Sequence, residues 1–317
     1  MELLLYAVIF SMVLIISNAT NKLFPRLPLP LIQIFLGIGW ALFIPAEQFH
    51  LDTELFLALV IGPLLFREAE EADITSILKY WRVILYLIFP VIFLSTLSLG
   101  WLAHSLWLSL PLAACMAVGA ALGPTDLVAF ASLSERFSFP KRVSNILKGE
   151  GLLNDASGLV AFRMALAALA TGAFSVGKAG ISLGISITGG LLVGLLTGFV
   201  NRWLQKLLLS VRASNIASEL LLELSLPLLT FFLAEELHVS GIIAVVVSGI
   251  LKASRFKQIT LLEARVDTVT HTVWNTVNFI LNGSVFVILG MELEMIAKPI
   301  LDLSLIHISE PTRQAEI

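Results

Sequence analysis

The sequence predicts an all-α polytopic membrane protein with about ten transmembrane helices. Three observations support this fold class. The 317 residues are 57% hydrophobic and only 14% charged, with a mean hydropathy of +0.93. A soluble domain of this size needs more charge to cover its surface. Apolar stretches recur along the whole chain, and the basic residues between them alternate in abundance.

The apolar stretches give the predicted spans in order. A helix needs about 20 apolar residues to cross a bilayer. The third and ninth stretches are short for this purpose, so their boundaries are the least well defined. The ten predicted spans are 2–19, 30–46, 53–66, 83–107, 110–133, 146–172, 180–200, 216–236, 239–251 and 273–296.

The distribution of Lys and Arg provides an independent check on this count. Sixteen of the 20 basic residues fall in or beside the odd-numbered loops, and the even-numbered loops contain almost none. Basic residues collect on the cytoplasmic side of a membrane. The alternation would fail if a span were missed or invented, and it predicts an N-terminus outside the cytoplasm.

Charge and cysteine content exclude other classes of protein. The net charge of −3 gives no basic surface for nucleic acid. One cysteine, Cys115 in an apolar run, argues against a disulfide framework or a cysteine-ligated metal site. No basic segment precedes the first apolar run, which argues against a cleaved signal peptide.

No linker divides the chain, so residues 1–302 are predicted to form one transmembrane domain. The last residues, 303–317, read "LSLIHISEPTRQAEI". Leu303 to Arg313 resemble the translation of a transposase adapter used in preparing sequencing libraries. We therefore expect a non-native tail after Asp302, with the gene continuing beyond it; a genuine polar C-terminus is the alternative.

The fifth span is interrupted at "LGPTDLVAF". Pro124 cannot donate a backbone hydrogen bond one turn back, and Gly123 lets the backbone turn. A second half-helix is expected to begin near Pro124, with Thr125 and Asp126 in its first turn, where a carboxylate offsets the helix dipole. An ordinary proline kink, with Asp126 near an interface, is the alternative.

The sixth span carries "GEGLLNDASGLV". A charged side chain at the centre of a membrane helix costs about 2.5–3.5 kcal/mol, so such residues usually mark a pathway. Gly151 and Gly158 share the face of Asp155 and allow another backbone to approach. Glu150 and Asn154 form an adjacent polar strip, although Glu150 could also make a plain ion pair near the cytoplasmic end.

Asp155 is the strongest candidate for chemistry. Desolvation favours the neutral form of a carboxylate, so a partly buried one can exchange a proton near neutral pH. When ionised, its oxygens are hard ligands for a small alkali cation. One group can hold a proton or a cation, and this competition is the basis of ion exchange.

These two motifs resemble the paired signature of the monovalent cation:proton antiporters, in particular the bacterial sodium/proton exchanger branch with an Asn-Asp pair. "LAEELHVSGIIAVVVSGI" and "NFILNGSVFVILGMEL" resemble later spans of that family in the same order. The resemblance implies an inverted-repeat fold with a discontinuous helix crossing another. It also implies a homodimer in the bacterial inner membrane that exchanges Na⁺ (or Li⁺ or K⁺) for H⁺ by alternating access, without a cofactor, in pH and sodium homeostasis.

The resemblance also implies roles for individual residues. Asp155 would bind ion and proton, with Thr125 and Asp126 on the broken helix and Asn154 beside it. Asn154 stands where electrogenic relatives have a second Asp, which implies electroneutral exchange. Glu150 matches an acidic position that pairs or assists.

Three features depart from the family pattern. Leu127 follows Asp126 where a proline is common, and Gly151 replaces a common serine. The family's second broken helix and its arginine-bearing helix would lie beyond Asp302. The chain is therefore expected to be an incomplete transporter.

Other polar residues in the spans leave alternatives open. Arg163 needs an anionic or carbonyl partner, because a buried arginine keeps its charge. Asp155 is about 12 Å away along the helix axis, too far for a tight pair; Asp126, a residue beyond the sequence, or the far interface remain. The acidic run "REAEEAD" (67–73) is expected to be a solvated loop.

Two other classes of function are alternatives. Two membrane aspartates could form an intramembrane aspartyl protease, but "PTDL" and "LLNDAS" lack the sequence contexts of such enzymes. A passive cation channel would need a selectivity filter, and no filter motif is evident. The sequence does not predict which alkali cation is preferred.

Overall fold

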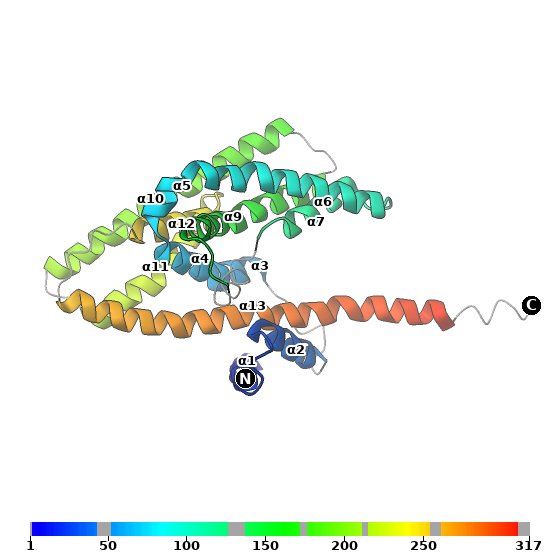
Figure 1. Ribbon diagram of the computed structural model, residues 1–317, viewed down its shortest axis with the longest axis horizontal. Helices are drawn as coiled ribbons and strands as arrows, with labels where there is room; N and C mark the ends of the chain where they lie inside the picture. Colours follow the sequence, from blue (N-terminus) through cyan, green and yellow to red (C-terminus); the bar gives the residue numbers. More distant parts are fainter. Residues whose placement is uncertain are drawn as a thin grey trace, which may run out of the picture. The chain divides into compact units, whose positions relative to one another are not determined.

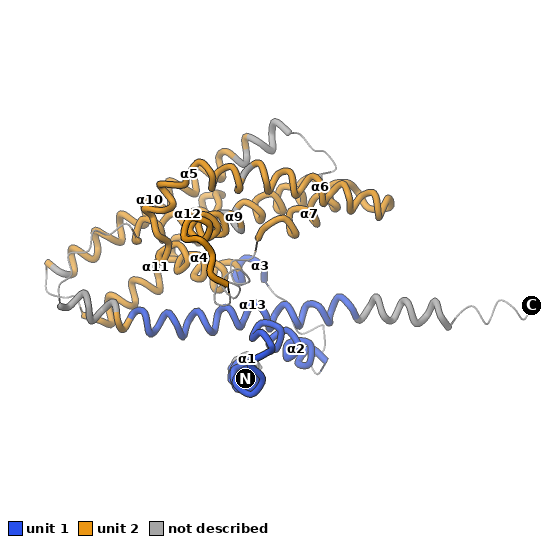
Figure 2. Tube along the Cα trace, viewed as in Figure 1, with its two compact units in different colours: residues 1–56, 270–317 blue, residues 57–269 orange. Residues whose placement is uncertain are grey.

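The computed structural model describes residues 2–42, 52–125, 137–171, 176–210, 215–253 and 261–309. Its regular structure within these ranges is entirely helical, with twelve α-helices and two short π-helical turns (Figure 1). The chain divides into two compact units, coloured separately in Figure 2: residues 1–56 with 270–317, and residues 57–269. The all-α prediction is confirmed.

The first unit contains α1 (Glu2–Leu23), α2 (Leu29–Ala41), the short α3 (Thr53–Phe56) and most of α13 (Leu261–Ser309). Leu14, Ala41, Val287 and Met291 form its buried core. α2 and α13 touch through backbone, since a Cβ at Gly37 would overlap the carbonyl oxygen of Val287. Two glycines facing each other, Gly37 and Gly290, make this close approach sterically possible.

The second unit begins with two chain segments that contain π-helical turns. Leu57–Ile61 (η2) leads into α4 (Gly62–Glu71). α5 (Ile74–Tyr86) continues through η3 (Leu87–Val91) into α6 (Ile92–Leu106). Pro90 lies inside η3, where the wider π turn accommodates a residue that cannot donate a helical hydrogen bond.

Small residues bring the next helices into backbone contact. α7 (Leu112–Leu122) packs antiparallel to α6, and a Cβ at Gly119 would overlap the carbonyl oxygen of Thr96. α9 (Lys141–Thr171) contacts both α5 and α7. This packing places the polar part of α9 beside the end of α7.

The remaining helices of this unit are α10 (Val176–Ser210), α11 (Ile216–Glu236) and α12 (Gly241–Ala253). Gly190 and Gly194 let α10 approach the backbone of α12. α12 also packs on α4 and α11, and the residues at its centre, Val245 and Val246, are completely buried. The four helices α4, α10, α11 and α12 therefore share one core.

Helix was found in every predicted span. Three helical stretches in the described ranges are both long and apolar enough to cross a membrane, namely Gly184–Leu208, Ile216–Glu236 and Thr268–Ala297. Six shorter apolar helices fall in the spans at 2–19, 30–46, 83–107, 110–133, 146–172 and 239–251. α13 continues past Asp302 to Ser309, so no helix end marks the expected junction with a non-native tail. That tail stays a prediction, and residues 310–317 lie outside the described ranges.

The acidic run at 67–73 is not a solvated loop, as the sequence suggested. Its first five residues complete α4, and Arg67 and Ala69 are buried. The prediction was wrong because the charge content of the run does not show that it continues a helix. One face of that helix packs on α12. Asp73 lies outside both helices and is the N-cap of α5, where its carboxylate accepts a hydrogen bond from Thr75 N.

Candidate ion site at the broken helix

The predicted break in the fifth span is present. α7 ends at Leu122, and residues 123–125 are not helical. Pro124 has no backbone N–H to donate one turn back, so the helical hydrogen bonding does not continue through it, although Gly123 itself keeps helical dihedral angles. Thr125 therefore lies in an irregular segment rather than in the first turn of a second half-helix, and Asp126 lies outside the described ranges.

Gly158 allows this irregular segment to touch α9. A Cβ at Gly158 would overlap Pro124 Cγ and would lie 3.3 Å from its Cδ. Any larger residue at 158 would push the two segments apart. The sequence correctly predicted a close approach at Gly158, and the approaching group is the proline of the break itself.

Thr125 joins the two polar residues of the α9 strip. Its hydroxyl donates to Glu150, with Oγ1 2.9 Å from Oε2 and 3.1 Å from Oε1. Asn154 Nδ2 donates to the same Thr125 oxygen over 2.9 Å. Glu150 and Asn154 are both buried. The three residues predicted from separate spans therefore form one hydrogen-bonded chain.

This chain fixes the orientation of the Asn154 amide. Thr125 uses its single hydroxyl proton on Glu150 and accepts from Asn154 Nδ2 through a lone pair of the same oxygen. The amide nitrogen of Asn154 must then face Thr125, and Oδ1 must face away from it. In the described part of the chain Oδ1 is buried without a hydrogen-bond partner. A buried, unpaired amide oxygen costs about 1–3 kcal/mol unless a donor or cation reaches it.

Asp155 follows Asn154 in α9, and its side chain lies outside the part of the chain that the structure describes. The backbone places it one residue, about 100° of helix rotation, from Asn154. Within the described ranges Glu150 makes no ion pair with Lys148, which was the simpler explanation of its position.

Arg163 finds its partner on another helix. Its Nη1 lies 3.3 Å from Oε1 of Glu235 at the end of α11. Both side chains are partly exposed. Glu235 is none of the partners that the sequence suggested for Arg163, which were Asp126, a residue beyond the sequence, and the interface.

Sequence reasoning missed a buried network of charged residues between α4, α11 and α12. Lys252 Nζ lies 2.6 Å from Glu223 Oε1 and 2.9 Å from Glu70 Oε1. Arg67 contacts Glu70 at 2.9 Å and Glu71 at 2.8 Å. The contacts of Lys252 are ion pairs by distance rather than well-aligned hydrogen bonds. The available signal was Glu223 inside an apolar span, a residue too costly to bury without a cation.

Comparison with solved structures supports the fold. The chain superposes on the sodium proton antiporter MjNhaP1 from Methanocaldococcus jannaschii, solved at pH 8, with a TM-score of 0.68. The identity is 19%, and the match covers 93% of this chain and 71% of that one. At this identity the likeness concerns the fold alone.

Sequence comparison gives nearer relatives. The chain is 37% identical over 293 residues to the sodium, potassium, lithium and rubidium/H⁺ antiporter of Bacillus subtilis (strain 168), covering 92% of this chain and 44% of the relative. It is 32% identical to the uncharacterized Na⁺/H⁺ exchanger YjcE of Escherichia coli (strain K12), covering 92% and 54% respectively. The chain thus spans about half the length of these relatives.

The family comparison agrees with both. The model of the family described as "Sodium/hydrogen exchanger, transmembrane" matches residues 7–308, which is nearly the whole chain. This match includes the broken helix and the polar strip of α9. The chain belongs to the sodium/hydrogen exchanger family of monovalent cation:proton antiporters.

Proposed function

We propose that this chain carries the first part of a secondary transporter that exchanges Na⁺, Li⁺ or K⁺ for H⁺ across the bacterial inner membrane. The observation that carries the proposal is the hydrogen-bonded chain Glu150–Thr125–Asn154 at a broken helix, one residue before Asp155. Family membership supports ion exchange and argues against the protease and channel alternatives.

The proposed chemistry is competition for Asp155. A protonated Asp155 is neutral and binds no cation, whereas the ionised carboxylate offers oxygen ligands. Asn154 Oδ1 is a second hard oxygen, on the residue that precedes Asp155 in the sequence, and coordination to a cation would satisfy that buried acceptor. Thr125 and Glu150 act as positioning residues, because they hold the Asn154 nitrogen and so direct its oxygen away.

The remaining features of the proposal follow from the same site. Asn154 cannot carry a second proton, so one carboxylate trades one proton for one monovalent cation, and the exchange is electroneutral. Alternating access would present this site to one side of the membrane at a time. A homodimer, an outside N-terminus and a role in pH and sodium homeostasis complete the proposal.

The test uses the longest open reading frame that contains this chain, expressed in everted membrane vesicles. A pH gradient is imposed, and Na⁺, Li⁺ and K⁺ are added in turn. We expect at least one cation to release protons in the wild type, and none to do so in Asp155→Asn. Asp52→Asn is the matched control, because it removes an exposed carboxylate while its amide oxygen can still cap α3.

Two outcomes would reject the proposal. One is a folded, inserted wild type that moves protons with none of the three cations. The other is full exchange in Asp155→Asn. Electroneutrality is tested separately by clamping the membrane potential with K⁺ and valinomycin while Na⁺ or Li⁺ is the transported ion. An exchange rate that follows the potential would contradict one-for-one stoichiometry.

A further inference from the structure

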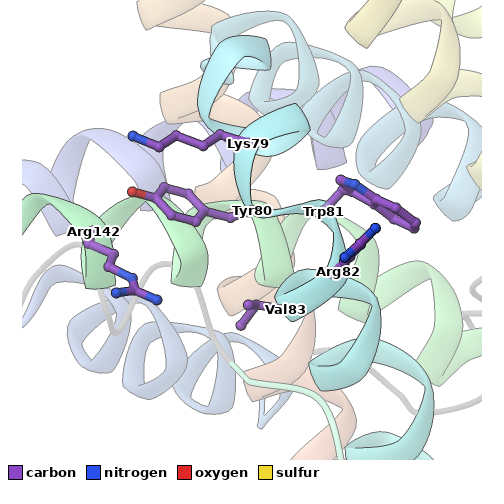
Figure 3. A pocket seen from close by; sticks show the side chains of 6 residues that line it. All are labelled: Lys79, Tyr80, Trp81, Arg82, Val83 and Arg142. Atoms are coloured by element: carbon purple, nitrogen blue, oxygen red, sulfur yellow. The ribbon is translucent and has the colours of Figure 1, made fainter.

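A positively charged recess lies where α5 meets the first turn of α9. It has a volume of about 400 Å³. Figure 3 shows Lys79 and Arg142 close to the Tyr80 ring, and Arg82 beside Trp81. The residues that line it are Lys79, Tyr80, Trp81, Arg82, Val83 and Arg142.

The recess gathers cations around aromatic rings. Lys79 Nζ lies 5.4 Å from the centroid of the Tyr80 ring, and Arg142 Cζ lies 5.8 Å from the same centroid. Arg82 Cζ lies 5.5 Å from the centroid of Trp81. Each exposed cation–π contact contributes about 0.5–1 kcal/mol, which orients the side chain without neutralising its charge.

No carboxylate of the described residues pairs with these cations. Within the described ranges none of the three cations forms an ion pair. Asp73, at the start of the same helix, uses its oxygens on Thr75 and Ser76. Two cations held at one ring repel each other, so the arrangement favours an anion between them.

An apolar surface continues directly from the recess. Along α5, η3 and α6 the side chains of Val83, Tyr86, Phe93 and Leu94 are exposed, and Trp81 is half-exposed beside the cations. In a membrane protein such a surface is covered by lipid chains, and Trp and Tyr mark the level of the headgroups. The ligand that fits both parts has an anionic head and hydrocarbon chains.

We propose that this recess binds the phosphate headgroup of an anionic phospholipid, with the acyl chains lying along the exposed face of α5 and α6. Guanidinium groups bind phosphate oxygens in pairs, and Lys79 adds a third positive contact. The recess lies between predicted spans whose connections carry Lys and Arg residues, and such connections face the cytoplasm, so the lipid would belong to the cytoplasmic leaflet. The lipid is a bound ligand of the transporter and is separate from the transported ion.

The experiment measures binding of phosphatidylglycerol to the full-length transporter by native mass spectrometry from detergent. The variant is Lys79→Gln/Arg82→Gln/Arg142→Gln, in which all three altered side chains are exposed. The control is Lys22→Gln/Arg26→Gln/Lys206→Gln, which removes the same charge from exposed positions in other predicted cytoplasmic segments. Phosphatidylcholine and glycerol 3-phosphate are the comparison ligands.

We expect at least a tenfold loss of phosphatidylglycerol affinity in the recess variant and less than a twofold change in the control. Equal losses in the two variants would show only general attraction of anionic lipid, and would overturn the site. Equal binding of phosphatidylcholine, or competition by glycerol 3-phosphate at equal concentration, would overturn the assignment to an anionic lipid. If the triple variant aggregates, Arg142→Gln alone is measured, with a threefold or greater loss expected.

Discussion

Replacing Lys252 with methionine removes the ammonium group that lies 2.6 Å from Glu223 and 2.9 Å from Glu70. All three side chains are largely buried, with exposures of 8%, 7% and 16%. Glu70 keeps Arg67 at 2.9 Å, so the main loss falls on Glu223. The substitution conserves length and apolar volume, so it tests charge rather than packing.

The expected magnitude follows from these distances. At an effective dielectric constant near 20, each contact corresponds to about 6 kcal/mol of Coulomb energy. The desolvation of both ions offsets most of this gain. Removing one partner nevertheless costs about 3–5 kcal/mol, because the buried carboxylate then lacks the ammonium group that balances its charge. We therefore expect Lys252→Met to lower the free energy of unfolding by about 3–5 kcal/mol.

The double variant Lys252→Met/Glu223→Met separates this explanation from a simple loss of contacts. It removes both charges, so it should be more stable than Lys252→Met by about 2 kcal/mol, within the usual range of coupling energies. Lys206→Met is the control, an exposed cation on α10 whose removal should change stability by less than about 0.5 kcal/mol. The measurement is equilibrium unfolding of the full-length protein in mixed micelles.

Two results would refute the reasoning. If Lys252→Met costs no more than Lys206→Met, the network carries no net stabilisation. If the double variant is as unstable as the single one, the loss does not come from the uncompensated charge of Glu223.

Three further predictions concern single positions. Thr125→Val, which removes the hydroxyl between the two α9 side chains, should slow exchange in vesicles by tenfold or more, whereas Thr125→Ser should keep most of the rate. Gly158→Val should cost about 1–3 kcal/mol of stability by pushing the broken segment away, whereas Gly184→Ala, which has open space around it, should remain stable in size-exclusion thermal assays. Hydrogen bonds, the largest from Ser76, lower the pKa of Asp73 below 3.8. Its cap on α5 should therefore be intact above pH 3.8 and be lost as pH falls through the lowered value, seen as faster amide exchange in the first turn of α5 and absent in Asp73→Asn.

Local sequence signals predicted the features that depend on neighbouring residues. The helix ends next to Pro124 because proline cannot donate the backbone hydrogen bond that would continue it, and this needs no tertiary information. Glu150 and Asn154 face the same way because they are four residues apart in a helix. The sequence alone could not show that the Thr125 hydroxyl bonds to both, since that depends on how α7 packs on α9.

The buried ion network shows why the rest could not be predicted. Glu70 and Lys252 are separated by most of the second unit, and each lies near a loop rich in charge. Taken singly, each residue is predicted to lie at the membrane surface in contact with water. The charge pattern alone therefore predicts exposed side chains where the structure has largely buried ones. Small residues of α10 and α12 let α12 pack closely against its neighbours, so that its last turn reaches α4 and α11. The ion network depends on this packing.

The contacts within the second unit suggest where a transport movement could occur. Buried ion pairs and close packing at small residues join α4, α10, α11 and α12. Apolar packing and the hydrogen bonds of Thr125 join α5, α6, α7 and α9. Among described residues, the partly exposed pair Arg163–Glu235 is a polar link between these two sets, and such pairs contribute about 0–1 kcal/mol. If the full-length protein works by alternating access, the boundary between α9 and α11 is the place where helices can separate at least cost. The hydrogen-bonded chain Glu150–Thr125–Asn154, which joins α9 to the segment after α7, would then move as one piece.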